Sequence, residues 1–295
     1  MKRQNIDKTV RSGFLLVALF SIVALSLIII FLFLEGIPIL EHVSLKEFLF
    51  GQYWYPTDDP ADFGILPLIL GSIYVTVISG MIAIPLGVMT AIYLAQIAPA
   101  TVSQIVKPIV ELLASMPSVV IGFFGMVVVA PFIQQLFNIP VGLNMFNASL
   151  MLAFMAVPTI CSISEDAVFS VPTALKEASL ALGATHFETL VRVIVPASLS
   201  GICTAIILGL SRAVGETMVV LMAAGGAAMI PTSIFDPVRP LPASIAAEMA
   251  EAPFRSEHYH ALFAIGIVLF VFTFLFNLLA DHISYKFRQV GEASL

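Results

Sequence analysis

The chain has 295 residues, of which 59% are hydrophobic and only 11% are charged, and its mean hydropathy is +1.03. A soluble globular domain of this length carries far more charge, so the composition excludes that class and predicts an all-α polytopic membrane protein. The formal net charge of −6 does not indicate nucleic acid as a partner.

The N-terminal segment is basic and precedes a long apolar run. The uncharged run Ser12–Leu34 spans roughly 34 Å as a helix, which is enough to cross the hydrocarbon core. It is too long for the core of a signal peptide. Residues 1–34 are therefore predicted to form a cytoplasmic tail and a retained first transmembrane helix.

Residues 35–65 form a first outer segment, rich in acidic and turn residues. It holds the only tryptophan, Trp54, between Tyr53 and Tyr55, an arrangement typical of an aromatic anchor at a membrane interface. A simple surface loop and a docking surface for a partner are both open for this segment.

Five further spans are predicted, largely from the long stretches that lack charge. No charged residue lies between Asp62 and Lys107, or between Glu111 and Glu165, and the second stretch has to cross the membrane twice. A helix as long as the first of these spans is expected to tilt, or to kink at Pro85. The spans are predicted near residues 66–97, 113–132, 148–164, 199–222 and 259–280.

Helix-breaking residues gather at the start of the third span, at Pro117, Gly122 and Gly125. At membrane depth such residues are tolerated chiefly where the freed backbone meets protein or lines a cavity. Ser115 and Ser118 are therefore candidates for a pathway that an anion follows. Close packing of helices is the alternative role for Gly122 and Gly125.

The fifth span carries two charges that the bilayer disfavours. Arg212 and Glu216 lie four residues apart near its middle, where a charge costs about 2.5 to 3.5 kcal/mol and needs a partner or water. One hypothesis is an internal ion pair. The other is that Arg212 contacts an anionic substrate, because guanidinium donors match oxyanions, while Glu216 holds Arg212 in the empty site or accepts a proton.

The same span has a regular pattern of small residues. Ala205, Gly209 and Ala213 recur every four residues, which predicts one closely packed helix face.

The distribution of basic residues predicts the topology. With six spans and both termini in the cytoplasm, nine basic residues lie inside and three outside, as the positive-inside rule requires. The inside residues are Lys2, Arg3, Lys8, Arg11, Lys107, Lys176, Arg192, Lys286 and Arg288, and the outside residues are Lys46, Arg239 and Arg255. Residues 283–295 are then a cytoplasmic tail.

A polar stretch between the fourth and fifth spans contains two short helical pieces. Small and apolar residues recur at helical spacing in Lys176–Leu182 and in His186–Ile194, and Gly183 supplies the backbone freedom for a sharp turn between them. From the residues alone, the stretch is either an amphipathic connection or a helix-turn-helix knob on the cytoplasmic face.

This stretch resembles the EAA loop of bacterial ABC importer permeases, with matches at Glu177, Ala178, Gly183 and Pro196. Conservative departures occur at Ser179, Val193 and Val195. The resemblance implies that residues 172–198 form a coupling helix that docks into a groove of a cytoplasmic ATPase subunit. Glu177 would pair there with a basic group.

Further segments, among them SRAVGETMVVLMAAGG and DPVRPLPASIAAEMAEA, are together similar to phosphate-specific ABC importer permeases of the PstC type. The resemblance covers most of the chain after residue 60. It implies a type I ABC importer permease fold over residues 66–282 in the bacterial plasma membrane, with Arg212 and Glu216 on the substrate path. The implied partners are a PstA-type permease, a PstB-type ATPase dimer and a soluble PstS-type phosphate-binding protein.

Sequence signatures of an enzyme are absent. No lysine follows a glycine, so the phosphate-binding P-loop is missing, and neither GxSxG nor HExxH occurs. A partner subunit is therefore expected to bind and hydrolyse ATP, and no cofactor is expected in this chain. Cys161 and Cys203 lie in apolar stretches and are expected to be free thiols. His258 and His260 suit an interfacial or capping role better than a metal site.

Two other functions remain open. A permease for a different oxyanion has the same architecture. An ion-coupled secondary transporter predicts an inverted repeat and activity without an ATPase, and no convincing repeat relates the two halves of the chain.

Overall fold

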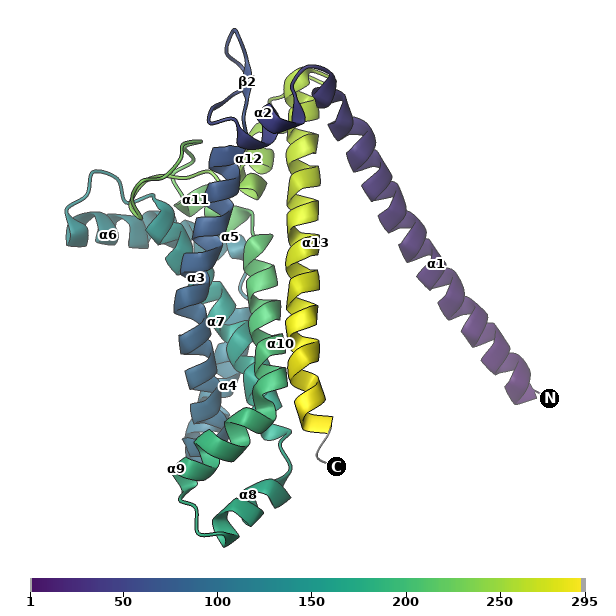
Figure 1. The fold of residues 1–295 in the computed structure, drawn as a ribbon, viewed down its shortest axis with the longest axis vertical. Helices are drawn as coiled ribbons and strands as arrows, with labels where there is room; N and C mark the ends of the chain where they lie inside the picture. The colour runs from purple at the N-terminus through teal and green to yellow at the C-terminus, as the bar shows by residue number, and fades with distance from the viewer. Residues whose placement is uncertain (1, 293–295) are drawn as a thin grey trace.

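The computed structural model describes residues 2–292, which are mostly helical (Figure 1). In chain order the elements are α1 (Lys2–Gly36), η1 (Ile37–Glu41), α2 (Leu45–Phe50), β1 (Trp54–Tyr55), β2 (Asp62–Phe63), α3 (Leu66–Ile92), η2 (Tyr93–Ile97), α4 (Ala100–Ala114), α5 (Ser118–Phe124), η3 (Gly125–Val129), α6 (Ala130–Phe137), α7 (Met145–Phe169), α8 (Thr173–Ala181), α9 (His186–Thr189), η4 (Leu190–Ile194), α10 (Val195–Val214), α11 (Met218–Ala223), α12 (Leu241–Glu248) and α13 (Glu257–Glu292).

Six stretches of the described chain are long and apolar enough to cross a membrane. They are Gly13–Glu41, Leu66–Ile97, Ser118–Phe137, Met145–Phe169, His186–Val214 and Glu257–Ala280. The predicted number of spans is therefore confirmed. α13 continues beyond its span to Glu292, and residues 293–295 of the predicted tail lie outside the described residues.

The helical bundle has two different ends (Figure 1). α8 and α9 lie at one end, which we call the loop end. The antiparallel pair β1–β2 lies at the other, the hairpin end, together with α2 and α12. In the strand pair Trp54 is opposite Phe63 and Tyr55 is opposite Asp62.

α7 forms the centre of the bundle, with α3 and α10 packed against it. Ile160 of α7 is fully buried and lies against Gly87 of α3 and Gly209 of α10. A Cβ atom added at these glycines would lie 2.8 Å from Ile160 Cγ2 and 2.5 Å from Ile160 Cγ1, respectively. The two glycines therefore allow both helices to approach α7 closely.

The predicted small-residue face of the fifth span is confirmed. Ala205, Gly209 and Ala213 are all buried along α10, as expected for a face that meets a neighbouring helix closely.

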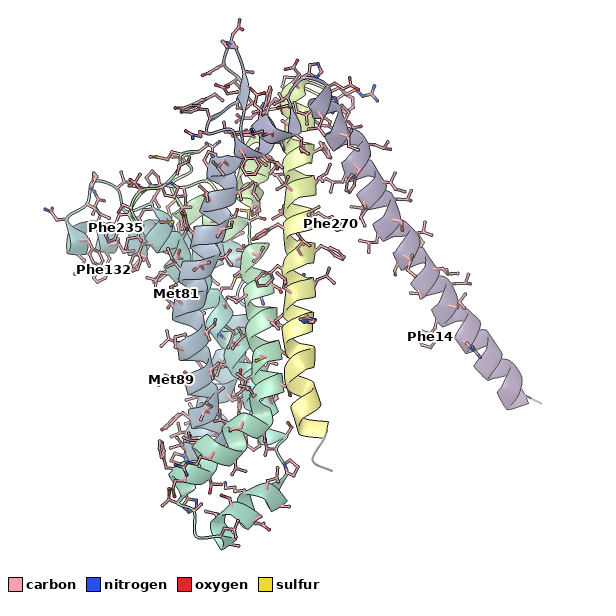
Figure 2. All side chains as sticks on the ribbon, viewed as in Figure 1. Phe14, Met81, Met89, Phe132, Phe235 and Phe270 are labelled. Atoms are coloured by element: carbon pink, nitrogen blue, oxygen red, sulfur yellow. The ribbon has the colours of Figure 1, made fainter. Side chains whose placement is uncertain are left out.

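Large apolar side chains cover the outer surface of the bundle. Phe14, Met81 and Met89 are 74%, 69% and 69% exposed, and they project away from their helices (Figure 2). α1 leans away from the rest of the bundle and meets α13 near its hairpin end (Figure 1). Such a surface is typical of helices that face lipid or another membrane subunit.

The predicted bounds of the third and the fifth spans were wrong. The third span runs over Ser118–Phe137, five residues later than predicted, because α4 ends as a separate helix before Pro117. The fifth stretch runs over His186–Val214 instead of residues 199–222, because α9, η4 and α10 form one continuous helix that ends before α11. In both places a break divides an apolar stretch that hydropathy alone treats as continuous.

The loop between α11 and α12 is closed by a carboxylate. Oδ2 of Asp236 accepts hydrogen bonds from the backbone N–H groups of Thr232 (2.7 Å) and Ser233 (2.8 Å) and from the Thr232 hydroxyl. These bonds favour the ionised form and hold the pKa of Asp236 below its ordinary value. The turn is therefore stabilised above the unfolded-state pKa and loses this stabilisation as the pH falls through the lower folded-state pKa.

The prediction of an interfacial role for Trp54 was wrong, although Tyr53 and Tyr55 beside it are exposed. The Trp54 side chain is 2% exposed, and its Nε1–H donates to both oxygens of Glu248, at 3.0 and 3.2 Å. Nη1 of Arg239 also donates to Glu248, and Nε2 of His258 lies 2.9 Å from Glu248 Oε2. The buried indole is accommodated because this carboxylate satisfies its N–H group.

We call Trp54, Arg239, Glu248 and His258 the Glu248 cluster. Its members come from β1, from the loop before α12, from α12 and from the first turn of α13. The Glu248 side chain is only 15% exposed. The cluster therefore joins the first outer segment to the second one, a connection between residues almost 200 positions apart.

Replacing Glu248 by alanine is expected to loosen the hairpin end. The change leaves the Trp54 N–H and the Arg239 guanidinium without their shared acceptor, which costs about 1–3 kcal/mol for each buried group. Because Trp54 is the only tryptophan, its fluorescence emission should move to longer wavelength and become accessible to iodide. The exposed Glu251, on the turn that follows α12, provides the control: Glu251→Ala should leave the emission unchanged, and an unchanged spectrum for Glu248→Ala would contradict the prediction.

The two cysteines and His260 can be placed in the structure. Cys161 and Cys203 are free thiols, as predicted. Nδ1 of His260 lies 2.7 Å from the backbone oxygen of Glu35, so this histidine joins the start of α13 to the end of α1. Within residues 2–292, no group of three or more potential metal ligands lies together.

Candidate coupling loop and polar helix breaks

α8 and α9 form the helix-turn-helix knob at the loop end, and Gly183 makes the turn between them. Its φ angle is +86°, a left-handed conformation that side chains other than glycine adopt at a cost. The N–H groups of Gly183 and Ala184 donate to Leu180 O (3.0 Å) and Ser179 O (3.3 Å), which closes the end of α8. Of the two hypotheses for this stretch, the structure therefore supports the knob.

Side chains fix the angle between the two short helices. Thr185 Oγ1 accepts from the Glu188 N–H, and the Glu188 carboxylate accepts from the Thr185 N–H, so the two residues form a capping box at the start of α9. The hydroxyls of Ser179 and Thr189 are hydrogen-bonded at 2.9 Å. The knob is therefore a preformed unit.

The free surface of the knob is apolar with a carboxylate beside it. Leu182 is 89% exposed and Phe187 is 73% exposed, on opposite sides of Gly183. Glu177 and Ala178 are also exposed on α8. Pro196 lies at the start of α10, directly after the π-helical turn η4, and such turns accommodate a residue that cannot donate to the regular helical hydrogen bonds. The four residues of the predicted loop pattern thus occupy one helical hairpin and the start of the following span.

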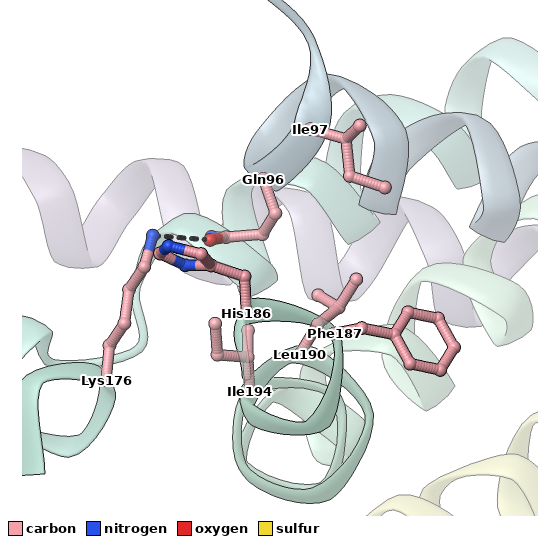
Figure 3. A pocket seen from close by; sticks show the side chains of 7 residues that line it. All are labelled: Gln96, Ile97, Lys176, His186, Phe187, Leu190 and Ile194. Carbon is pink, nitrogen blue, oxygen red and sulfur yellow. Dashed lines mark hydrogen bonds between the residues drawn. The ribbon is translucent and has the colours of Figure 1, made fainter. Parts of the chain in front are cut away.

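The knob is also attached to the end of the second span. Lys176 Nζ donates to Gln96 Oε1 at 3.2 Å, and Figure 3 shows the His186 ring beside this bond. A cavity of about 180 Å³ lies between η2 and α9, lined by these three residues and by Ile97, Phe187, Leu190 and Ile194. A displacement of the knob therefore acts on η2, which continues α3.

The first break in a span lies between α4 and α5. Ser115 follows the last residue of α4 and donates from Oγ to Leu112 O at 2.8 Å. Pro117 precedes α5, Ser118 is its first residue, and no side chain caps its N-terminus. The predicted helix break is therefore confirmed at Pro117 alone, since Gly122 and Gly125 lie within the continuous helical stretch Ser118–Phe137. The role of the two serines in a pathway stays a prediction.

The second break lies between α10 and α11 and changes the interpretation of Arg212 and Glu216. α10 ends at Val214, so the two residues are not one turn apart on a continuous helix. Oε1 of Glu216 accepts from the N–H groups of Met218 (3.1 Å) and Val219 (3.4 Å). Among the described residues Arg212 forms no ion pair with Glu216, and the Arg212 side chain is exposed. The hypothesis of an internal ion pair is therefore wrong for this conformation, because the carboxylate caps a helix instead.

The helices that follow the two breaks pack against each other. A Cβ atom added at Gly122 of α5 would lie 3.1 Å from Met218 O and 3.2 Å from Val219 Cα of α11. Gly125 lies against Met151 of α7 in the same way. Both glycines therefore serve helix packing, which was the alternative role predicted for them.

Lys107, Glu165 and Asp166 form a further charged group, which the sequence pattern did not predict. Glu165 on α7 is 2% exposed, and Lys107 Nζ on α4 lies 3.4 Å from Glu165 Oε1 and 3.3 Å from Asp166 Oδ1. In the sequence these charges lie at the edges of uncharged stretches, so they indicated where the spans end but not which residues pair. Their pairing joins α4 to the end of α7 near the loop end.

These features define a class of protein. The fold is that of a type I ABC importer permease, and it matches the MetNI methionine ABC transporter with a TM-score of 0.61 and 20% identity, over 76% of this chain and 95% of that chain. It also matches a bacterial alginate ABC transporter solved with an alginate-bound periplasmic protein, with a TM-score of 0.57 and 15% identity, over 92% of this chain and 94% of that chain. The predicted fold class is thus confirmed.

The family follows from the sequence comparison. Residues 83–289 match the model of the binding-protein-dependent transport system inner membrane component, and the chain belongs to this family. It is 40% identical to the protein named "Probable ABC transporter permease protein YqgH" of Bacillus subtilis, over 91% of this chain and 88% of that protein. It is 35% identical to the phosphate transport system permease protein PstC of Mesorhizobium japonicum, over 80% and 77% of the two chains. The predicted resemblance to PstC-type permeases is therefore confirmed.

Proposed function

We propose that this chain is the membrane-spanning subunit of an ATP-driven importer that moves inorganic phosphate into the bacterial cell. The observation that carries the proposal is the preformed, apolar knob of α8 and α9 in a chain of this family that is 35% identical to a phosphate permease. The knob offers a surface for an ATPase subunit, and the chain itself has no P-loop to bind ATP.

In this proposal the loop end faces the cytoplasm and both termini lie there. The positive-inside count supports this orientation. Glu177, Ala178, Gly183 and Pro196 belong to the element that docks on a PstB-type ATPase. A PstA-type permease completes the membrane part, and a PstS-type binding protein delivers phosphate at the hairpin end.

The proposed pathway passes the two helix breaks. Arg212 supplies a guanidinium that can form paired hydrogen bonds with a phosphate oxyanion, and its exposure and lack of an ion pair with Glu216 leave it accessible for this role. Glu216 lines a small cavity with Ser72 and Thr76 and holds the first amides of α11 in place. Ser115 and Ser118 mark the other break.

The proposal is tested by uptake of radiolabelled phosphate into vesicles that contain this chain, the partner permease and the ATPase, with binding protein outside and ATP inside. Uptake is expected to require both ATP and the binding protein. Glu177→Leu should abolish uptake while the complex still assembles, because the docking carboxylate is lost. Arg212→Gln should lower uptake about a hundredfold with ATPase binding unchanged, because the variant cannot form the charge-assisted paired hydrogen bonds with the substrate oxyanion.

Uptake without the ATPase would overturn the proposal in favour of a secondary transporter. If sulfate or molybdate moves in place of phosphate, the chain is a permease for another oxyanion. If Arg212→Gln transports as the wild type does, Arg212 is not on the pathway.

A further inference from the structure

An open pocket of about 840 Å³ lies at the hairpin end, away from the coupling loop and the helix breaks. One wall is the start of the β1–β2 turn, including Tyr55 and Thr57. The others are the segment after Gly225, including Met229, the end of α12 and the turn that follows it. The pocket is much larger than a single ion needs, and its volume lies in the range of sites that bind larger groups.

The floor of this pocket is rigid, because all four members of the Glu248 cluster line it. The Arg239 guanidinium is already engaged by the Glu248 carboxylate and by Gly226 O, at 2.7 Å for the latter. His258 is engaged by the same carboxylate. The Glu248 carboxylate therefore offsets the positive charge of the floor, which leaves the floor little net attraction for an anion.

The charge that remains at the pocket and around it is negative. Glu251 lines the pocket, is exposed, and forms no side-chain hydrogen bond or ion pair with the described residues. Asp58 and Asp59 are exposed on the β1–β2 turn beside it. Residues 35–64 and 225–257 together carry ten acidic and three basic side chains. Such a surface repels a free oxyanion and attracts a basic protein surface.

We propose that this pocket receives a basic loop of the soluble binding protein, with Glu251 as the principal ion-pair partner. The inference rests on the proposed function and specifies where and by what chemistry the delivering protein docks. Tyr55 (50% exposed) and Met229 (43% exposed) supply contact surface of the kinds enriched in protein interfaces. The acidic surroundings raise the rate of encounter with a basic partner, while the preformed floor keeps the ordering cost low.

The test measures binding of the phosphate-loaded binding protein to the assembled transporter in lipid nanodiscs, at low and at high salt. Glu251→Lys should raise Kd about fivefold or more at low salt, through a slower association, and the difference should shrink at high salt because exposed charges are screened. Glu41→Lys is the matched control. It changes the net charge equally at an exposed position of the hairpin end that does not line the pocket, and it should change Kd less than twofold.

Phosphate uptake by the same preparation separates this inference from the proposed function. If the wild type imports phosphate but Glu251→Lys and Glu41→Lys bind the delivering protein alike, the pocket is not its docking site. Binding that is insensitive to salt would also overturn the inference. If the wild type moves no phosphate in the presence of ATP and binding protein, the proposed function itself fails.

Discussion

Leu182→Glu is expected to abolish ATP-driven uptake by preventing the ATPase subunit from binding. Leu182 is 89% exposed at the tip of the knob, so the substitution leaves the packing of this chain unchanged. In a docked complex the new carboxylate would be buried without a partner, which costs about 3 kcal/mol or more and corresponds to at least a hundredfold weaker association. Co-purification of the ATPase with the membrane subunits measures this loss directly.

A matched control adds the same charge to the same helical hairpin. Thr173 is exposed in the first turn of α8, where a carboxylate is favoured by the helix dipole, and Thr173→Glu should bind the ATPase nearly as well as the wild type. Normal ATPase binding by Leu182→Glu would show that the knob is not the docking element. Equal loss in both variants would show that the loop responds to charge in general.

Gly209→Leu is expected to destabilise the packing of α10 against α7 strongly. A Cβ at this position would lie 2.5 Å from Ile160 Cγ1 and 3.0 Å from its Cδ1, so a leucine side chain forces α10 away from α7. Overpacking of this kind costs about 1–3 kcal/mol or more, which lowers the midpoint of thermal unfolding by roughly 5 °C or more in a chain of this size. Unfolding of the purified chain in detergent provides the measurement.

Two further variants make this prediction specific. Gly13→Leu changes a glycine of α1 that has open space around it, and it should leave the unfolding midpoint unchanged. Ile160→Ala in the background of Gly209→Leu removes the side-chain atoms that collide, so the double variant should regain part of the lost stability. A Gly209→Leu protein as stable as Gly13→Leu would mean that α7 and α10 are not in such close contact.

The attachment of the knob suggests how its displacement reaches the membrane part. Lys176 binds Gln96 at the end of the second span. The capping box fixes the start of α9, and α9 continues through η4 into α10 as one helix. α10 leads to Arg212 and to the break before α11. A pull on the knob therefore acts on α3 and α10 together, the two helices that pack on α7 through Gly87 and Gly209.

The sequence by itself determined the membrane class, the number of spans, the position of the α8–α9 knob and the small-residue face of the fifth span. Each depends on signals that are local in the chain: uncharged runs, helical spacing on either side of Gly183, and small residues at Ala205, Gly209 and Ala213. Hydrophobic length and local periodicity are sufficient here, because the bilayer imposes them on every span separately.

Only the tertiary structure decided which partner each isolated polar side chain binds. Glu216 caps α11 instead of pairing with Arg212, Lys107 pairs with Glu165 and Asp166, and Trp54 is buried against Glu248 instead of lying at an interface. Each of these outcomes depends on which donor or acceptor a distant segment brings within reach. A buried polar group is satisfied by the nearest partner in space, and that partner cannot be found from spacing along the chain.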